Sequence, residues 1–461
     1  MNTGSSTNFF LVARRLLTQG TKFVFKRVSI YKRYFLRALL IGFVLSGVVT
    51  VMAWLGHFEP YENRLTDFLQ SITSKKADEV VLLFITEREY KQSFGGTSPL
   101  SRARLAEMID MLVKLRARVI ALDIDMSDCT PEDDQLSAAL NHASSAGIPI
   151  VFIASCKEIA EKTPLGSRFS GSLSPYPETT QHFTDRGFFL FEDVSPGSQW
   201  MGKVMYGGVV FRLDPDGVFR RAEVLYLKKG AGPKSGVSSQ SLPSFPLAVA
   251  AAYQGMSQGE IVEALSDFPN NDIILSQKGN HHLQRIPGGR GGRITPNFIG
   301  DYKYFHREVN LTRLLEDYGP GKPGGLTVFR DKIVIVGGTY DKKDFFMTPV
   351  GRISGTEVLA NITQSILSGN LITRANFAKA FAIQIILGAI VALLFILIPR
   401  FWATVICFVA LVPMVATASI LSFSSSYYWV SFIPTIAGVM FHGWVKRVEE
   451  YILTKKRRGN S

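Results

Sequence analysis

Four stretches of the chain are long and predominantly apolar. A helix that crosses a bilayer needs about 20 such residues, so the pattern predicts four transmembrane helices, at residues 38–56, 377–398, 401–421 and 428–445. A cleaved signal peptide is the alternative for the first run. However, the basic segment before that run and the run itself are both too long for one, and no small-residue cleavage site follows.

The segment between the first and second runs, residues 57–375, alternates between two kinds of pattern. Short runs with an apolar centre predict buried strands at 79–86, 118–125, 148–154 and 332–336. Apolar residues at helical spacing predict helices at 61–72, 101–115, 130–146 and 355–367. Strands that alternate with helices of this length form a parallel sheet, which predicts an α/β domain.

The middle of this domain is rich in Gly, Ser, Pro and aromatic residues, and it predicts antiparallel hairpins. One hairpin is expected to join 204–213 to 218–227 through the turn Asp214-Pro-Asp-Gly217, and another to join 273–276 to 282–286. The expected fold is therefore an α/β domain with a parallel or mixed sheet and a hairpin region, attached to four transmembrane helices.

The positive charge is concentrated at the two ends of the chain. Residues 1–37 hold eight Lys/Arg and no acid, and residues 446–461 hold six Lys/Arg and two Glu, so +12 of the net +13 lies in these tails. A nucleic-acid-binding domain needs a basic face, and little charge is left for one. Basic tails beside apolar helices stay on the cytoplasmic side of a membrane. Two cytoplasmic tails require an even number of spans, which places 57–375 outside the cytoplasm.

Acidic residues at a predicted strand end are the candidate ligand site. Asp123 and Asp125 fall where a central parallel strand ends, and ligands of α/β folds bind beyond such ends. Asp344 lies in a loop after another strand and is the third candidate. The alternative for Asp123 is a structural role as an acceptor of backbone N–H groups. No P-loop or metal-ligand spacing is present, His281-His282 included, and no catalytic residues, metal or cofactor are expected.

Two of the three cysteines are candidates for a disulfide. Cys129 and Cys156 each follow a predicted strand, so both emerge at the same edge of the sheet, and an extracytoplasmic location permits oxidation. Neighbouring strands bring such loops within the roughly 7 Å between Cα atoms that a bridge requires. Two free thiols are the alternative.

Two segments resemble a known family. SRARLAEMIDMLVKLRARVIALDIDMSD with TPEDDQLSAAL, and FRDKIVIVGGTYDKKDFFMTPVGRISGTEVLANITQSILSGNLI, are similar to the first half and the ending of a CHASE domain of type two. The resemblance implies an extracellular sensory domain of a bacterial receptor, with three spans after the domain. Members of this family commonly carry a catalytic output domain after the last span, whereas 16 residues follow Val445 in this sequence.

These observations predict a multi-pass protein of the bacterial plasma (inner) membrane that contacts lipid. Its sensory or ligand-binding domain would lie in the periplasm or outside the cell, with both termini cytoplasmic. It is expected not to be an enzyme and to act through a separate membrane or cytoplasmic protein. A homo-oligomer is left open, and the alternative function is a structural subunit of an envelope assembly.

Overall fold

The computed structural model describes 14 parts of the chain, and the chain divides into two compact units, residues 66–372 and residues 1–65 with 373–461. The described residues are 40–72, 78–157, 190–191, 193–195, 198–200, 202–228, 241–265, 273–276, 283–286, 293–299, 308–310, 314, 328–340 and 344–458. The basic tail 1–37 and the pair His281-His282 lie outside them.

A seven-stranded sheet forms the centre of the unit 66–372. Its order is β13–β1–β14–β2–β3–β5, and β6 also pairs with β3. Every pairing is parallel except that of β3 with β5. The strands are β1 (Val80–Ile85), β2 (Val119–Asp123), β3 (Ile150–Lys157), β5 (Asp193–Ser195), β6 (Met205–Gly208), β13 (Glu308–Asn310) and β14 (Ile333–Gly338). The parallel sheet predicted from the apolar runs is confirmed.

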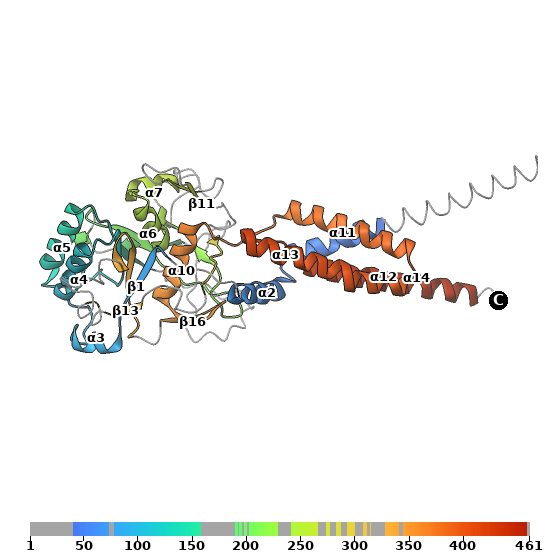
Figure 1. Cartoon of the computed structure of the whole chain (residues 1–461), viewed down its shortest axis with the longest axis horizontal. Helices are drawn as coiled ribbons and strands as arrows, with labels where there is room; N and C mark the ends of the chain where they lie inside the picture. The colour runs from blue at the N-terminus through green and yellow to red at the C-terminus, as the bar shows by residue number, and fades with distance from the viewer. Residues whose placement is uncertain are drawn as a thin grey trace, which may run out of the picture. The chain divides into compact units, whose positions relative to one another are not determined.

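Alternation along the strands divides the core into two layers. Val81, Leu83 and Ile85 of β1 join the layer beneath α4 (Arg102–Lys114) and α5 (Asp133–Ser145). Val80 and Leu82 join the layer beneath α6 (Phe245–Tyr253) and α10 (Gly355–Ser368). Figure 1 shows α4 and α5 on one side of β1 and α10 on the other. Both faces are covered, which is the reason that the central strands β1 and β14 are apolar throughout.

Local signals explain where the main helices begin. Ser101 accepts a hydrogen bond from the Arg104 N–H at the start of α4. Ser354 and Glu357 form a reciprocal capping box at the start of α10, and α10 ends at Gly369, whose φ of 67° is left-handed. Helix α5 begins at Asp133 rather than at Thr130, and the Asp133 carboxylate accepts hydrogen bonds from the Thr130 backbone N–H and hydroxyl, as an acid at this spacing does before a helix.

One of the two predicted hairpins forms and the other does not. β10 (Ile273–Ser276) pairs antiparallel with β11 (Leu283–Ile286) as expected. The pairing of 204–213 with 218–227 was wrong, since β6 adds to the central sheet and β8 (Leu225–Lys228) pairs with β9 (Ser241–Pro243). A Cβ on Gly207 would lie 2.5 Å from the Phe245 Cα, so this glycine lets β6 pass directly beside the start of α6. That close packing holds β6 in the sheet.

The unit is completed by short elements around the sheet. These are α3 (Glu87–Gln92), β4 (Leu190–Phe191), β7 (Ala222–Glu223), α7 (Gln258–Ala264), β12 (Arg293–Ile294), β15 (Phe345–Thr348) and β16 (Gly351–Ser354). β15 and β16 form an antiparallel hairpin that leads directly into α10.

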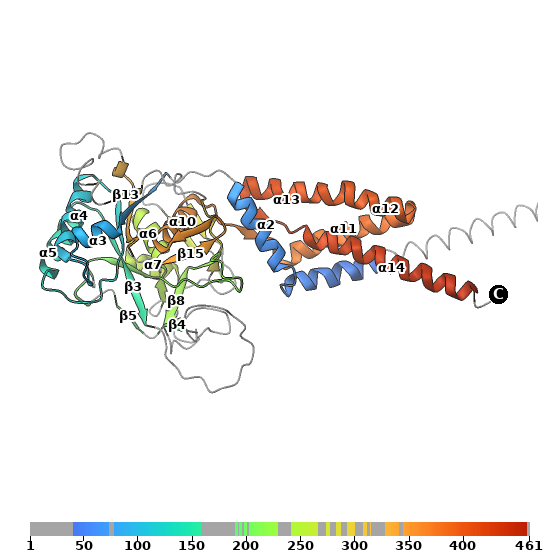
Figure 2. The same cartoon turned by 90° about the horizontal axis from the view of Figure 1, so that it is seen from below.

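The second unit is mainly helical. α11 (Phe377–Leu397) packs against α12 (Arg400–Ile406) and against α14 (Ile433–Arg458). A π-helical turn over Cys407–Leu411 joins α12 to α13 (Val412–Ser426), just before Pro413, which lacks an N–H to donate. β17 (Thr373–Arg374) pairs with β18 (Tyr428–Trp429). In Figure 2, α11 to α14 run alongside one another.

The expectation of four transmembrane helices is only partly supported. Two helices, Phe377–Leu397 and Phe401–Ser426, are long and apolar enough to cross a membrane by length and composition. A third counts if Leu40–Trp54 and α2 (Glu59–Ile72), bent by 72°, are one span. The fourth predicted span is shorter than expected: β18 occupies its first residues, so the apolar part of α14 is only Ile433–Val445.

Candidate functional site

The carboxyl ends of β2 and β14 bring together residues that are far apart in the sequence. Asp123 is the last residue of β2 and lies opposite Gly337 of β14 in the strand register. Thr356 belongs to the first turn of α10, and its hydroxyl donates a 2.7 Å hydrogen bond to Asp123 Oδ2. The sequence-based candidate Asp123 therefore lies at the sheet end, as expected for ligand sites of α/β folds.

The glycine opposite Asp123 makes this contact possible. A Cβ on Gly337 would lie 2.0 Å from the Thr356 Oγ1 and 2.6 Å from its Cγ2. No side chain larger than hydrogen fits between the strand and the helix at this point. Thr356 can thus enter the sheet edge and reach Asp123 only because position 337 is glycine.

Asp344 reaches the same place from the β15–β16 hairpin. It directly precedes β15, and Gly355 directly follows β16; the Gly355 N–H donates to the Asp344 carbonyl oxygen at 3.0 Å. A Cβ on Gly355 would lie 2.4 Å from Asp344 Oδ2, so the carboxylate sits against the first turn of α10. Helix N-termini favour negative charge, which fits a carboxylate at this position.

Burial and the neighbouring charge of Asp344 alter the ionisation of Asp123. Burial raises the pKa of the partly buried Asp123 to about 7; the hydrogen bond from Thr356 opposes this rise, and the negative charge of Asp344 adds to it. Near neutral pH the Asp123–Asp344 pair therefore gains or loses a proton easily. A pair of this kind can hold a proton, a cationic group or a hydrogen-bonding ligand.

Asp125, the third candidate, does not join this pair. It is exposed, and its Oδ1 accepts the Ser127 backbone N–H at 2.9 Å. Its negative charge also acts on the fully buried guanidinium of Arg102, which helps to keep that group protonated. The sequence placed Asp123 and Asp125 together at the end of one strand, but β2 ends at Asp123 and Asp125 lies in the loop that follows.

The structure does not support the predicted disulfide between Cys129 and Cys156. Cys129 is an exposed free thiol in the loop between β2 and α5. Strand β3 runs on to Lys157, so Cys156 is still part of the sheet, where it pairs with Val194 of β5. The sequence argument assumed that β3 ends near Ala154, which would have placed Cys156 in a loop.

Two buried arginines near the strand ends were not singled out from the sequence. Arg102 is fully buried; it contacts the Met126 sulfur and the Asp128 carbonyl oxygen, and its Nε lies 3.7 Å from Asp133 Oδ1. Burial lowers its pKa, while the carboxylates of Asp133, Asp125, Asp128 and Glu132 oppose that shift. Arg102 is the first residue of α4, where a basic side chain is unfavourable. This unfavourable position is the feature of the sequence that could have singled out Arg102.

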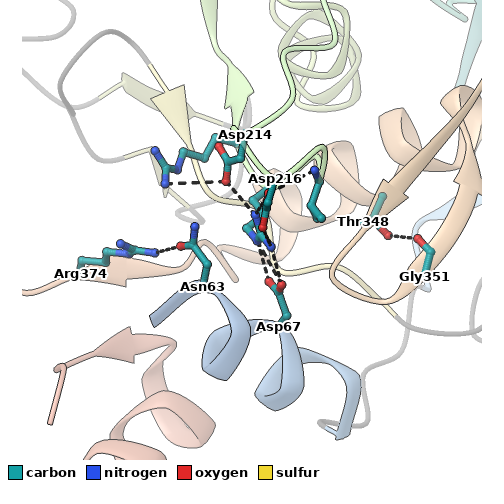
Figure 3. A network of polar contacts seen from close by, with 10 residues as sticks. Asn63, Asp67, Asp214, Asp216, Thr348, Gly351 and Arg374 are labelled. Carbon is teal, nitrogen blue, oxygen red and sulfur yellow. Dashed lines mark hydrogen bonds and ion pairs between the residues drawn. The ribbon is translucent and has the colours of Figure 1, made fainter. Parts of the chain in front are cut away.

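Arg220 is the centre of a second polar network. Its side chain is 5% exposed and forms ion pairs with Asp67, Asp214 and Asp216 at 2.8 to 3.1 Å. Asp67 and Asp216 each accept two or more hydrogen bonds from this one guanidinium. In Figure 3 the three carboxylates converge, with Asp67 coming from α2. Arg220 thereby links the turn Asp214–Gly217, which the sequence predicted, to helix α2.

Within the described part of the chain, no group of three or more His, Cys, Asp or Glu residues is placed to hold a metal ion. The pair formed by Asp123 and Asp344 provides two carboxylates, and Thr356 provides one hydroxyl.

Comparison with protein families identifies the chain. The model of the CHASE2 domain matches residues 44–398, which is more than half of the sequence. The chain belongs to the CHASE2 family. CHASE2 domains are extracellular sensory domains, so the resemblance seen in the sequence is confirmed. Comparisons with curated proteins and with solved structures returned no match.

The CHASE2 match covers the sheet, the Asp123–Asp344 pair and α10. It also extends into the apolar helices on both sides of the domain, from within Leu40–Trp54 to the end of α11. The candidate site thus lies within the family's sensory domain.

Proposed function

We propose that this CHASE2 protein is a membrane-anchored receptor whose extracytoplasmic domain uses the Asp123–Asp344 pair as its sensing element. The stimulus is a ligand with a cationic or hydrogen-bond-donating group, or a change in proton concentration. The observation that carries the proposal is that both carboxylates meet the first turn of α10, Asp123 through the hydrogen bond from Thr356 and Asp344 against Gly355.

The pair is placed to alter α10. When both carboxylates are charged, they repel each other; a proton or a bound cationic group removes that repulsion. Asp344 belongs to the hairpin side of the site, and Thr356 to α10 itself. Among the described groups, Asp344 is the charge that acts on Asp123. A change at the pair therefore acts on the hydrogen bond that joins α10 to the sheet.

Helix α10 leads from the pair toward the end of the domain. Along its length, the Asn361 Oδ1 accepts the Ile299 N–H at 2.7 Å, and the Ser365 hydroxyl oxygen accepts the Asn297 N–H at 3.1 Å. The unit ends at Ile372, four residues after α10. A shift of α10 can thus change the segment by which the chain leaves the sensory unit.

The remaining parts of the proposal concern the membrane and a partner. The apolar helices anchor the protein in the bacterial inner membrane with both termini in the cytoplasm, as the basic tails favour. We further propose that a separate membrane or cytoplasmic protein produces the response and that this chain is not itself an enzyme. Exposed apolar side chains on one face of α14 offer a surface for that protein: Trp444, Val448, Tyr451 and Ile452.

Hydrogen exchange of α10 in the full-length protein tests the sensing mechanism. We expect backbone amides of residues 355–368 to exchange differently at about pH 5.5 and about pH 8.5 after correction for intrinsic rates, because the pair changes charge between them. Asp123→Asn should abolish the difference, and the matched control Asp125→Asn should keep it. Equal protection at both pH values in the wild type would contradict proton sensing, and equal protection with and without candidate cationic ligands would contradict ligand sensing.

A site-specific photo-crosslinker tests the partner. Placed at Tyr451, on the apolar face of α14, it should capture one defined protein in native membranes. Placed at the exposed Thr454, it should not. Capture of several envelope proteins that remain together as one complex would favour the alternative, a structural subunit of an envelope assembly.

A further inference from the structure

A cavity of about 230 Å³ lies within the unit formed by residues 1–65 and 373–461. It is bounded by the helix Leu40–Trp54, the beginning of α2, the first turns of α11 and the segment that joins β18 to α14. Its volume is far above the roughly 10–15 Å³ that one water molecule requires. The cavity is therefore large enough for part of an organic ligand.

One side of the cavity carries a charged pair. The Arg374 Nη1 lies 3.6 Å from the Glu62 carboxylate, and its Nη2 donates a 2.9 Å hydrogen bond to the Asn63 Oδ1, drawn in Figure 3. The Arg374 side chain is 37% exposed and lines the cavity, so its guanidinium is accessible to a ligand. Guanidinium groups of this kind bind phosphate oxygens well.

Buried donors without a partner lie beside this pair. Trp429 is 1% exposed, and within the described residues neither its Nε1 nor the Ser431 Oγ has a hydrogen-bond partner. Both residues line the cavity. Trp429 is also the register partner of Arg374 in the parallel pairing of β17 with β18, so the two side chains leave the ribbon on the same face. A ligand oxygen in the cavity would satisfy these donors after a small side-chain rotation.

The opposite wall is apolar and aromatic. The rings of Trp54 and Phe377 meet edge to face with centroids 6.1 Å apart, and Ala380 and Ile383 continue this surface along α11. A ligand that fits must combine an apolar part with a group that accepts hydrogen bonds and carries negative charge.

We propose that this cavity binds a membrane phospholipid, with the phosphate at Arg374, a glycerol-ester oxygen at Trp429 and Ser431, and the start of an acyl chain against the apolar wall. The inference rests on the membrane anchoring in the proposed function. Trp54, Tyr428 and Trp429 are the aromatic residues expected at a membrane interface, and they mark the ends of apolar helices. That level is where phosphate and ester groups of lipids lie.

Lipid retention by the full-length protein tests the proposal. After purification in mild detergent and extensive detergent exchange, native mass spectrometry should detect about one phospholipid per chain, and added short-chain phosphatidylethanolamine or phosphatidylglycerol should restore it after stripping. Ala380→Phe fills the cavity and should weaken binding at least about tenfold. The matched control Ala382→Phe lies on the same helix, is exposed and does not line the cavity, so it should bind as the wild type does.

Further experiments distinguish a phospholipid from a free phosphate compound as the ligand. They also include a second variant in case Ala380→Phe does not fold. Inorganic phosphate and glycerophosphate alone should compete weakly, and equal affinity for them would overturn the assignment to lipid. Arg374→Gln should retain neutral diacylglycerol while losing the preference for phospholipid. Equal retention by Ala380→Phe and Ala382→Phe, or no retained lipid in the wild type, would also overturn it. None of these readouts depends on Asp123 or on a protein partner, so failure here is distinct from failure of the proposed function.

Discussion

The hydroxyl of Thr356 lies 2.7 Å from Oδ2 of Asp123, although 233 positions separate the two residues in the sequence. This bond joins the first turn of α10 to the end of the central strand β2. It also brings Asp123 to the helix turn against which the Asp344 carboxylate lies, so the two candidate ligand-binding carboxylates share one site.

The stability of the sensory domain should depend on the ionisation of Asp123. Its pKa is about 7 in the folded protein and 3.8 as the reference value. The folded state thus binds more protons between these values, and stability should fall as pH rises from about 4 to about 7 and stay level above. The total loss is on the order of 2–4 kcal/mol. Asp123→Asn should remove this dependence and raise the melting temperature near pH 8, measured by calorimetry; an unchanged profile would contradict the raised pKa.

Removal of the Thr356 hydroxyl should raise the pKa of Asp123 further. The hydrogen bond from Thr356 favours the charged carboxylate, and Thr356→Val deletes the donor while keeping the shape. The carboxyl resonance of Asp123, followed by NMR in isotope-labelled protein, should titrate at higher pH in this variant. Thr356→Ser retains the hydroxyl and should titrate as the wild type does. An unchanged pKa in Thr356→Val would show that the hydroxyl does not donate to Asp123.

Gly337→Ala should separate α10 from the sheet. Its Cβ would overlap the Thr356 Oγ1, so either the hydroxyl or the helix must move. We expect a loss of about 1–3 kcal/mol, as for other overpacked positions, together with the same rise in the pKa of Asp123 as in Thr356→Val. Gly259→Ala in α7 meets nothing within 4 Å and should leave both quantities nearly unchanged. A silent Gly337→Ala would argue against the close approach.

Replacement of Arg220 should strongly destabilise the sensory domain. The buried guanidinium neutralises Asp67, Asp214 and Asp216, and its loss leaves these carboxylates without their cation. Breaking a buried ion pair from one side costs about 3–5 kcal/mol. Arg220→Met should therefore lower the denaturant midpoint markedly. Arg221→Met removes a longer, 3.8 Å contact to Asp214 and is the matched control; equal effects of the two would contradict a central role for Arg220.

Cys129 should react as a free thiol from outside the cytoplasm. It is exposed and unpaired in the sensory domain. An impermeant maleimide should label the protein without reduction in intact cells whose outer membrane, if present, is permeabilised, and Cys129→Ser should abolish that labelling. Labelling only after the inner membrane is opened would reverse the proposed topology. Labelling only after reduction would show that Cys129 forms a disulfide after all.

The sequence by itself determined four strands of the central sheet, their parallel arrangement and the family. Runs such as Val80–Ile85 and Ile333–Gly338 are apolar throughout because both faces of the sheet are covered, and this local property is visible in the chain. It also identified Asp123 and Asp344 separately, since each follows a strand.

Only the tertiary structure decided which of these residues meet. Asp123 pairs with Asp344 rather than with Asp125, because strand order places β14 beside β2 and Gly337 opens a path for Thr356. Cys129 stays free because β3 extends past Ala154. Arg220 forms its ion pair with Asp67 because α2 packs against a turn about 150 residues away in the sequence. Such contacts depend on strand order and on where strands end. Both are set by long-range packing, which no local pattern of residues records.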